Sequence, residues 1–83
     1  MITAEQVRGA RAILGWSQGE LARMANVSLT TIRRMEDSAI GPGRSSGDNV
    51  LAVQRALEAA DIAFIPENGG GAGVRLAKPR GEK

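Results

Sequence analysis

The segment VSLTTIRRME, residues 27–36, carries two adjacent arginines, Arg33 and Arg34. A guanidinium presents a planar fork of N–H donors, so it binds phosphate oxygens or the edge of a guanine base through paired hydrogen bonds. On a helical wheel of about 100° per residue, Thr30, Arg33 and Arg34 lie on the side away from the apolar Ile32. The segment therefore predicts a short helix whose outer face either binds an anionic partner or is simply solvated.

The other positions of this helix also have directions on the wheel. Ile32 and Met35 define an inward face, and Leu29 and Thr31 lie on its flanks. Leu29 stands near the helix start, where an apolar side chain can contact a thymine methyl group. Glu36 lies only about 40° from Ile32, so its carboxylate is turned partly inward.

Capping residues mark where the helices that must position these side chains begin. Thr3 is followed three residues later by Gln6, and Ser17 by Glu20, which is the spacing of a capping box. Ser28 is a good N-cap for the segment that bears the arginines. Three short helices are therefore expected in the first half of the chain.

The links between the helices have their own signals. Asn26 separates the second and third helices, and asparagine tolerates the left-handed backbone geometry that a sharp turn needs. Residues 38–47 are rich in Gly, Ser and Pro and predict a loop. Residues 48–60 predict a fourth helix, with its cap left open between Ser46 and the two residues after it. A fifth short helix near residues 37–40 is left open.

The C-terminal part has a different character. Two β-prone runs, Ile62–Ile65 and Val74–Leu76, flank the glycine-rich PENGGGAG and predict a hairpin. An isolated hairpin is only marginally stable, so this one needs a surface to pack on. We expect residues 1–61 to form a helical domain, residues 62–78 a hairpin that dimerises or else covers its own core, and residues 79–83 a flexible tail.

Composition argues against catalysis and against a membrane segment. The 83 residues include no cysteine and no histidine, which removes disulfides, thiol chemistry, histidine acid–base chemistry and the usual zinc sites. The only glycine-rich loop lacks the lysine of a phosphate-binding loop, and no helix follows it. No apolar run is long enough to span a bilayer, and no signal peptide is visible. We expect a cytoplasmic protein that is not an enzyme and has no metal or cofactor.

Charge is distributed unevenly along the chain. Residues 1–47 hold six arginines and four acids, whereas residues 48–74 hold one arginine and four acids. Residues 75–83 hold four Lys or Arg and one acid. A surface for nucleic acid is therefore expected in the first half or in the tail.

The stretch WSQGELARMANVSLTTIRRME, residues 16–36, resembles the helix-turn-helix of phage-repressor-like regulators, the Cro/cI or XRE family. The likeness rests on SQ-x-E-L-A, on VS before the third helix, and on T-I-x-x-x-E within it. It implies a mostly α, four- to five-helix lambda-repressor-like bundle with a C-terminal β-hairpin. It also implies a transcriptional regulator that binds double-stranded DNA as a homodimer, with helix 28–36 in the major groove.

The resemblance also suggests roles for single residues. Gln18 would contact a phosphate and brace the third helix, Arg44 would contact phosphate, and Arg11 and Glu36 would form a structural salt bridge. Asn26 replaces the glycine usual at the turn. The positions that would reach bases or backbone are Ser28, Leu29, Thr30, Thr31, Arg33 and Arg34.

A protein-interaction module, such as an antitoxin or antiactivator, remains the alternative. The acidic middle of the chain and its modest net charge of +2 favour it. Such a module would use the same helices to bind a protein partner.

Overall fold

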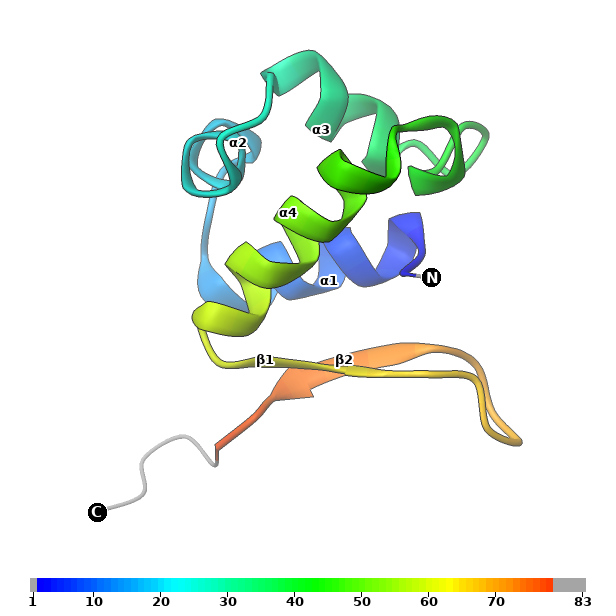
Figure 1. The fold of residues 1–83 in the computed structure, drawn as a ribbon. Helices are drawn as coiled ribbons and strands as arrows, with labels where there is room; N and C mark the ends of the chain where they lie inside the picture. The colour runs from blue at the N-terminus through cyan, green and yellow to red at the C-terminus, as the bar shows by residue number, and fades with distance from the viewer. Residues whose placement is uncertain (1, 79–83) are drawn as a thin grey trace.

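Four α-helices and a β-hairpin make up residues 2–78, the part of the chain that this computed structural model describes (Figure 1). The predicted mostly helical chain with a C-terminal hairpin is confirmed, and the predicted tail 79–83 lies outside the described residues. In chain order the elements are α1 (Ala4–Leu14), α2 (Gln18–Ala25), α3 (Leu29–Glu36), the 3-10 helix η1 (Pro42–Arg44), α4 (Gly47–Ala59), β1 (Ile62–Ile65) and β2 (Gly73–Leu76).

The helices begin where the capping residues predicted. Thr3 and Ser17 form complete capping boxes, and the Ser28 hydroxyl accepts the backbone N–H of Thr31 at 3.1 Å. Ser46 caps α4, which settles the open choice and starts that helix at Gly47. Each cap satisfies a backbone donor that has no partner within the helix.

A fifth short helix is present, but it lies later in the chain than the residues considered for it. Residues 37–40 do not form a helix, and η1 follows instead at Pro42–Arg44. Gly41 has a positive φ of 74° with an extended ψ of 172°, and Pro42 then supplies the fixed φ that suits the first helical position. The chain therefore turns once more before it reaches α4.

Asn26 makes the sharp connection between α2 and α3. Its backbone is left-handed, with φ of 57° and ψ of 45°, and its N–H closes the last turn of α2. The next N–H, that of Val27, donates to the carbonyl of Ala22 at 3.0 Å. These bonds end α2 and leave only three residues before α3 starts.

All four α-helices contribute to one aliphatic core. Helix α3 supplies Ile32 and Met35, which are both fully buried, as the wheel predicted. Trp16 and Phe64, the only aromatic residues, are partly buried against this cluster. The other fully buried large side chains are Val7, Leu21, Val53 and Leu57.

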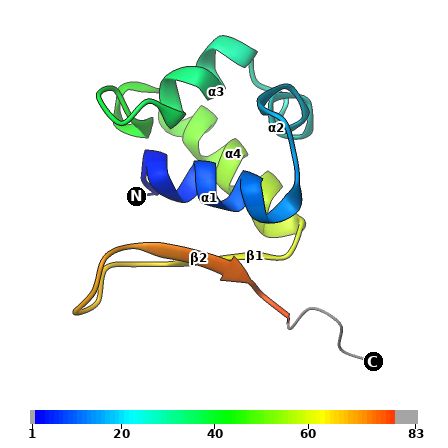
Figure 2. The same cartoon turned by 180° about the vertical axis from the view of Figure 1, so that it is seen from behind.

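The hairpin covers the end of the helical body opposite α3, as the two views in Figures 1 and 2 show. Its strands are antiparallel, with Ile62 paired to Leu76 and Phe64 to Val74. These four side chains are buried or packed against the core. Strand β2 lies against α1 and β1 against α4. The hairpin therefore covers its own core with one face.

Gln6 attaches the hairpin to α1. Its side chain is only 4% exposed, and its Nε2 donates to the carbonyl oxygens of Ile65 at 3.2 Å and Gly73 at 2.9 Å. The same side chain accepts the N–H of Thr3 in the capping box. One buried amide thus completes the start of α1 and holds the strand pair against it.

Candidate nucleic-acid interface

Helix α3 exposes the side that the wheel directed away from the core. Thr30, Arg33 and Arg34 are exposed, and Leu29 is 37% exposed. Within residues 2–78 neither arginine of α3 takes part in an ion pair. The two guanidinium groups therefore keep their N–H forks for groups outside the described part of the chain.

The hydroxyl groups at the start of α3 are partly engaged with each other. The Ser28 and Thr31 hydroxyl oxygens lie 2.8 Å apart, and Ser28 also caps the helix. Ser28 is exposed and Thr31 is half-buried. One of the two hydroxyl hydrogens is used between these oxygens, so only the other is left to donate to an external acceptor.

A polar hollow of about 540 Å³ lies beside α3, where η1 and the start of α4 meet it. It brings Arg34 and Arg44 to one concave surface, although they are ten positions apart in the sequence. Hydroxyl and amide groups complete it, and the N-terminus of α4 adds the positive end of a helix dipole. The hollow is lined by Thr31, Arg34, Ile40, Arg44, Ser45 and Asn49.

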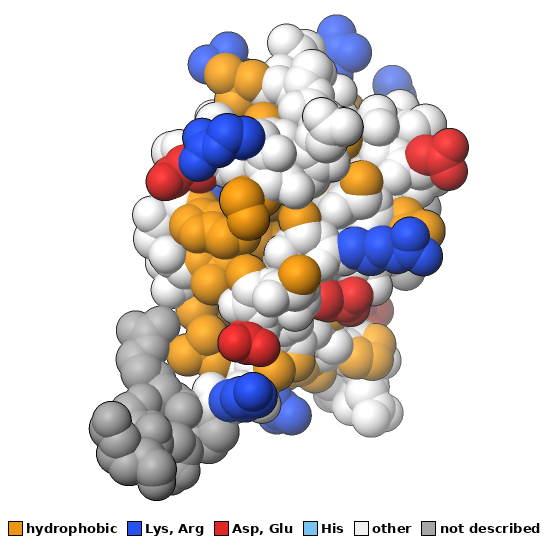
Figure 3. Space-filling model, turned by 60° about the vertical axis from the view of Figure 1, so that its left-hand side comes forward, with side chains coloured by type: hydrophobic (Ala, Val, Ile, Leu, Met, Phe, Trp, Pro, Cys, Tyr) orange, Lys and Arg blue, Asp and Glu red, His pale blue; other side chains and the backbone are white. Residues whose placement is uncertain are grey.

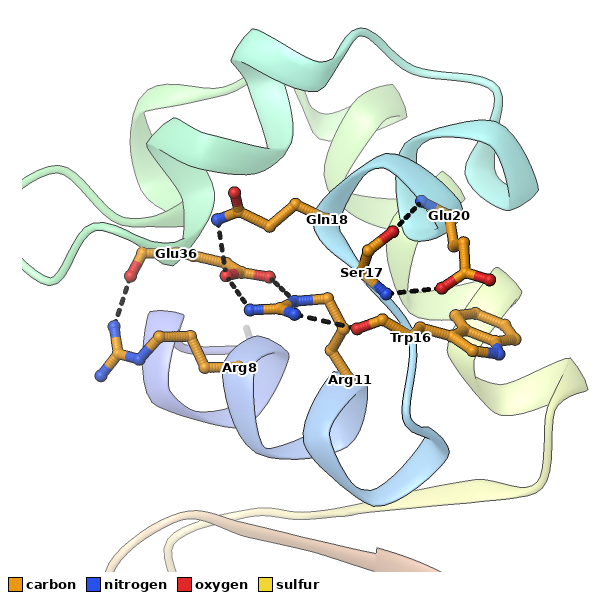
Figure 4. Close-up of polar contacts among 7 residues, drawn as sticks. All are labelled: Arg8, Arg11, Trp16, Ser17, Gln18, Glu20 and Glu36. Carbon is orange, nitrogen blue, oxygen red and sulfur yellow. Dashed lines mark hydrogen bonds and ion pairs between the residues drawn. The ribbon is translucent and has the colours of Figure 1, made fainter.

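The expected ion pair between Arg11 and Glu36 is present and ties α1 to the end of α3 (Figure 4). Arg11 donates Nε and Nη2 to the two carboxylate oxygens of Glu36 at 2.7 and 2.9 Å. Glu36 is only 4% exposed, so the pair is largely withdrawn from water. The hydrogen bonds that Arg11 donates to this carboxylate raise the pKa of Arg11 above its ordinary value.

Gln18 does not lie at the hollow but against the same carboxylate. Its Nε2 donates to Oε1 of Glu36 at 3.0 Å, as Figure 4 shows. The expected bracing contact to the third helix is therefore made, and it runs to the side chain of Glu36. An amide nitrogen carries two N–H groups, so one N–H of Gln18 is left for an outside acceptor.

Sequence reasoning missed Arg8, which holds the backbone at the end of α3. Its Nη1 donates to the carbonyl oxygen of Glu36 and to the hydroxyl of Ser38. Ser38 in turn donates to Glu5 at 2.7 Å, and this bond lowers the pKa of the Glu5 carboxyl from its ordinary value. Arg8 precedes Arg11 by three residues, a spacing that places both on one side of α1. This spacing is the sequence signal that could have indicated a role for Arg8 beside that of Arg11.

The start of α2 is also hydrogen-bonded to Arg11. Arg11 donates its Nη1 to the carbonyl oxygen of Trp16 at 2.9 Å, next to the Ser17 cap of α2. One guanidinium thus reaches α1, the link to α2 and the end of α3. The relative positions of these three helices are set by side chains away from the exposed face of α3.

The described residues contain neither a metal-binding cluster nor a membrane span. No three His, Cys, Asp or Glu side chains in this part of the chain come close enough to hold a metal ion. No helix among residues 2–78 has the length and hydropathy needed to cross a membrane.

Comparison of the sequence with models of known protein families and with curated proteins gives no match. The chemistry of α3 and its surroundings is therefore the basis for a functional proposal.

Proposed function

We propose that the protein is a sequence-specific transcriptional regulator of the lambda-repressor-like helix-turn-helix type, which binds double-stranded DNA as a homodimer. Helices α2 and α3 with the Asn26 turn would form the motif, and α3 would enter the major groove. Catalysis, a metal and a cofactor have no part in this proposal. The observation that carries it is an exposed arginine pair, without an ion pair among residues 2–78, on a short helix whose C-terminal end is hydrogen-bonded to α1 and α2.

The hydrogen bonds that hold the C-terminal end of α3 support the proposal, because this helix has only eight residues. A helix so short does not persist alone in water, since too few hydrogen bonds offset the cost of starting it. Arg8, Arg11 and Gln18 each bond to Glu36, its last residue. A fixed helix loses little entropy on binding, and its arginines keep a defined direction toward base edges.

The hollow beside α3 supplies the contact that sequence-independent affinity requires. Arg34 and Arg44 can neutralise a phosphate there, with Thr31, Ser45 and Asn49 as further hydrogen-bonding groups. Contacts to phosphate position a protein on the duplex, and contacts to bases give specificity. We assign Arg44 to the first role, and Thr30 and Arg33 to the second, with Leu29 against a thymine methyl.

Substituting the two arginines tests the proposal. Arg33→Ala removes a paired contact to a base and should weaken binding to the preferred site by about 1–3 kcal/mol, whereas Arg34→Ala removes a phosphate contact and should weaken binding to all sequences alike. Binding is measured by fluorescence anisotropy in moderate salt, on a site obtained by unbiased selection of bound DNA. Arg55→Ala, which removes an exposed arginine of α4, is the control and should bind as the wild type does. Normal binding by the double alanine variant would refute the assignment.

Exposed apolar side chains favour a second candidate function, a protein-interaction module such as an antitoxin or antiactivator. Met24 on α2 is 57% exposed and Leu51 on α4 is 41% exposed. Figure 3, in which the α2 side comes forward, shows apolar side chains gathered on that face. A DNA selection that enriches no sequence, together with stoichiometric capture of one protein, would favour this function.

A further inference from the structure

We propose that the outer edge of β1 pairs with β1 of a second copy, antiparallel, about a two-fold axis beside Ala63. Among residues 2–78 the sheet has two strands, so each strand has one edge without a described neighbour. Neither Figure 1 nor the reverse view in Figure 2 shows a described element in front of the hairpin. Such an edge presents backbone N–H and C=O groups that another strand can pair with.

The register of the hairpin determines which backbone groups the β1 edge offers. Asp61 accepts the N–H of Ala77, so this opposed pair is of the hydrogen-bonded type. The types alternate along antiparallel strands, which makes Ile62 with Leu76, and Phe64 with Val74, pairs of the other type. The N–H and C=O groups of Ile62 and Phe64 therefore point outward. Ile62 of each copy can exchange both bonds with Phe64 of the other.

Charge favours β1 over β2 as the pairing edge. Strand β1 reads Ile-Ala-Phe-Ile and has no charged side chain, whereas β2 has the exposed Arg75 at its centre. Two β2 strands about a two-fold axis would bring two arginines together, and like charges across strands are destabilising. A charged residue on an edge strand is also a common device against pairing. Pro66, which has no N–H, limits the β1 ladder at its far end.

The strand that pairs with the β1 edge is expected to come from a second copy of this chain because of the symmetry of the pairing. This step rests on the proposed function. Antiparallel strands in one sheet are related by a two-fold axis perpendicular to the sheet. Such an axis leaves the helices of both copies on the same face of a continuous four-stranded sheet. Because α3 lies on the far side of the helical body from the hairpin (Figure 1), both α3 helices then face one side. One duplex can contact both, as a two-fold operator requires.

Side-chain sizes fit this register. At the two-fold axis Ala63 faces its own copy in a non-hydrogen-bonded pair, where Cα atoms approach to about 4.5 Å. Its small side chain lies on the outer face of the hairpin, opposite Arg75. Phe64 is half-buried and keeps part of its ring exposed, whereas Ile62 is only 2% exposed and is already buried in its own copy. The pairing would therefore rest mainly on the backbone hydrogen bonds of Ile62 and Phe64.

The close approach at Ala63 allows a direct test, because the chain has no cysteine. A separation of about 4.5 Å lies within the range that a disulfide bridges. In a glutathione redox buffer without DNA, we expect Ala63→Cys to convert mostly into a covalent dimer, seen on a non-reducing gel. Arg75→Cys, on the same face of the other strand, is the matched control and should stay mostly monomeric.

A second variant tests the same edge without covalent chemistry. Ala63→Lys places like charges at the axis, so we expect dimerisation at least about tenfold weaker in sedimentation. At a concentration where both proteins are monomeric, its melting temperature should match that of the wild type. Failure of Ala63→Cys to cross-link, or faster cross-linking of Arg75→Cys, would overturn the inference. Neither readout uses DNA. Failure to cross-link alongside specific DNA binding would therefore refute this edge alone, and a cross-linked dimer that selects no DNA would refute only the proposed function.

Discussion

Glu36 is the residue on which the position of α3 depends. Its carboxylate accepts from Arg11 and Gln18, and its carbonyl oxygen accepts from Arg8. A buried carboxylate without such partners would cost several kcal/mol of desolvation. The structure thus uses one charged side chain to join α1, α2 and α3.

Removing Arg11 tests how much its ion pair with Glu36 stabilises the fold. Arg11→Ala leaves the carboxylate of Glu36 buried with only Gln18 as side-chain donor, so we expect a loss of about 3 kcal/mol in urea unfolding. The double variant Arg11→Met, Glu36→Leu removes both charges and should recover much of that loss. An unchanged unfolding midpoint for Arg11→Ala would show that the ion pair does not stabilise the fold.

At the scale of the elements, the turn between α2 and α3 depends on one backbone conformation. Asn26 is left-handed at φ of 57°, a region in which most side chains are strained and glycine is not. The side chain of Asn26 is exposed. Asn26 therefore contributes to stability mainly through its backbone conformation. Substitutions at this position test that backbone preference with little loss of side-chain contacts.

Substitutions at Asn26 should follow backbone preference. We expect Asn26→Ala to lower the free energy of unfolding by about 1 kcal/mol, Asn26→Val to lower it further, and Asn26→Gly to leave it near wild type. Thermal and urea unfolding measure the differences. If the glycine variant were the least stable of the three, side-chain contacts of Asn26 would have to explain its role.

Much of the element pattern could be predicted because caps are local signals. Ser17, Ser28 and Asn26 act on residues within one turn of their own position, so the sequence alone identified the helix ends around them. The inward turn of Glu36 was likewise predictable from helical periodicity.

Long-range bonds from side chain to backbone could not be predicted in the same way. Arg8 reaches the Glu36 carbonyl and Gln6 reaches two hairpin carbonyls, and a carbonyl oxygen belongs to every residue. No residue type at the receiving end therefore marks the contact. The hollow that joins Arg34 to Arg44 depends on the path of residues 37–46, which Gly41 and Pro42 bend into η1.

At the scale of the whole molecule, pairing through β1 would make DNA binding sensitive to the spacing of half-sites. Two α3 helices on one side of a rigid dimer reach half-sites about one helical turn, or 34 Å, apart. Inserting about 5 base pairs turns one half-site to the opposite side of the duplex. We expect wild-type affinity to fall then to that of a single half-site, measured by electrophoretic mobility shift.

The monomeric variant provides the control for spacing. Ala63→Lys should bind both spacings alike and with the affinity of a single half-site, because its copies bind independently. Wild-type affinity that does not depend on the spacing would argue against a rigid dimer on DNA.

The contact between Gln6 and the hairpin also has a consequence for how the chain folds. Gln6 is separated from Ile65 and Gly73 by 59 and 67 residues, so it is synthesised long before its partners. Contacts between such distant residues form slowly, because a long loop must close first. We therefore expect the four helices to collapse first and the hairpin to dock onto Gln6 afterwards. A bond that forms after the transition state acts mainly on the rate of unfolding, so this amide would set how long the native state lasts.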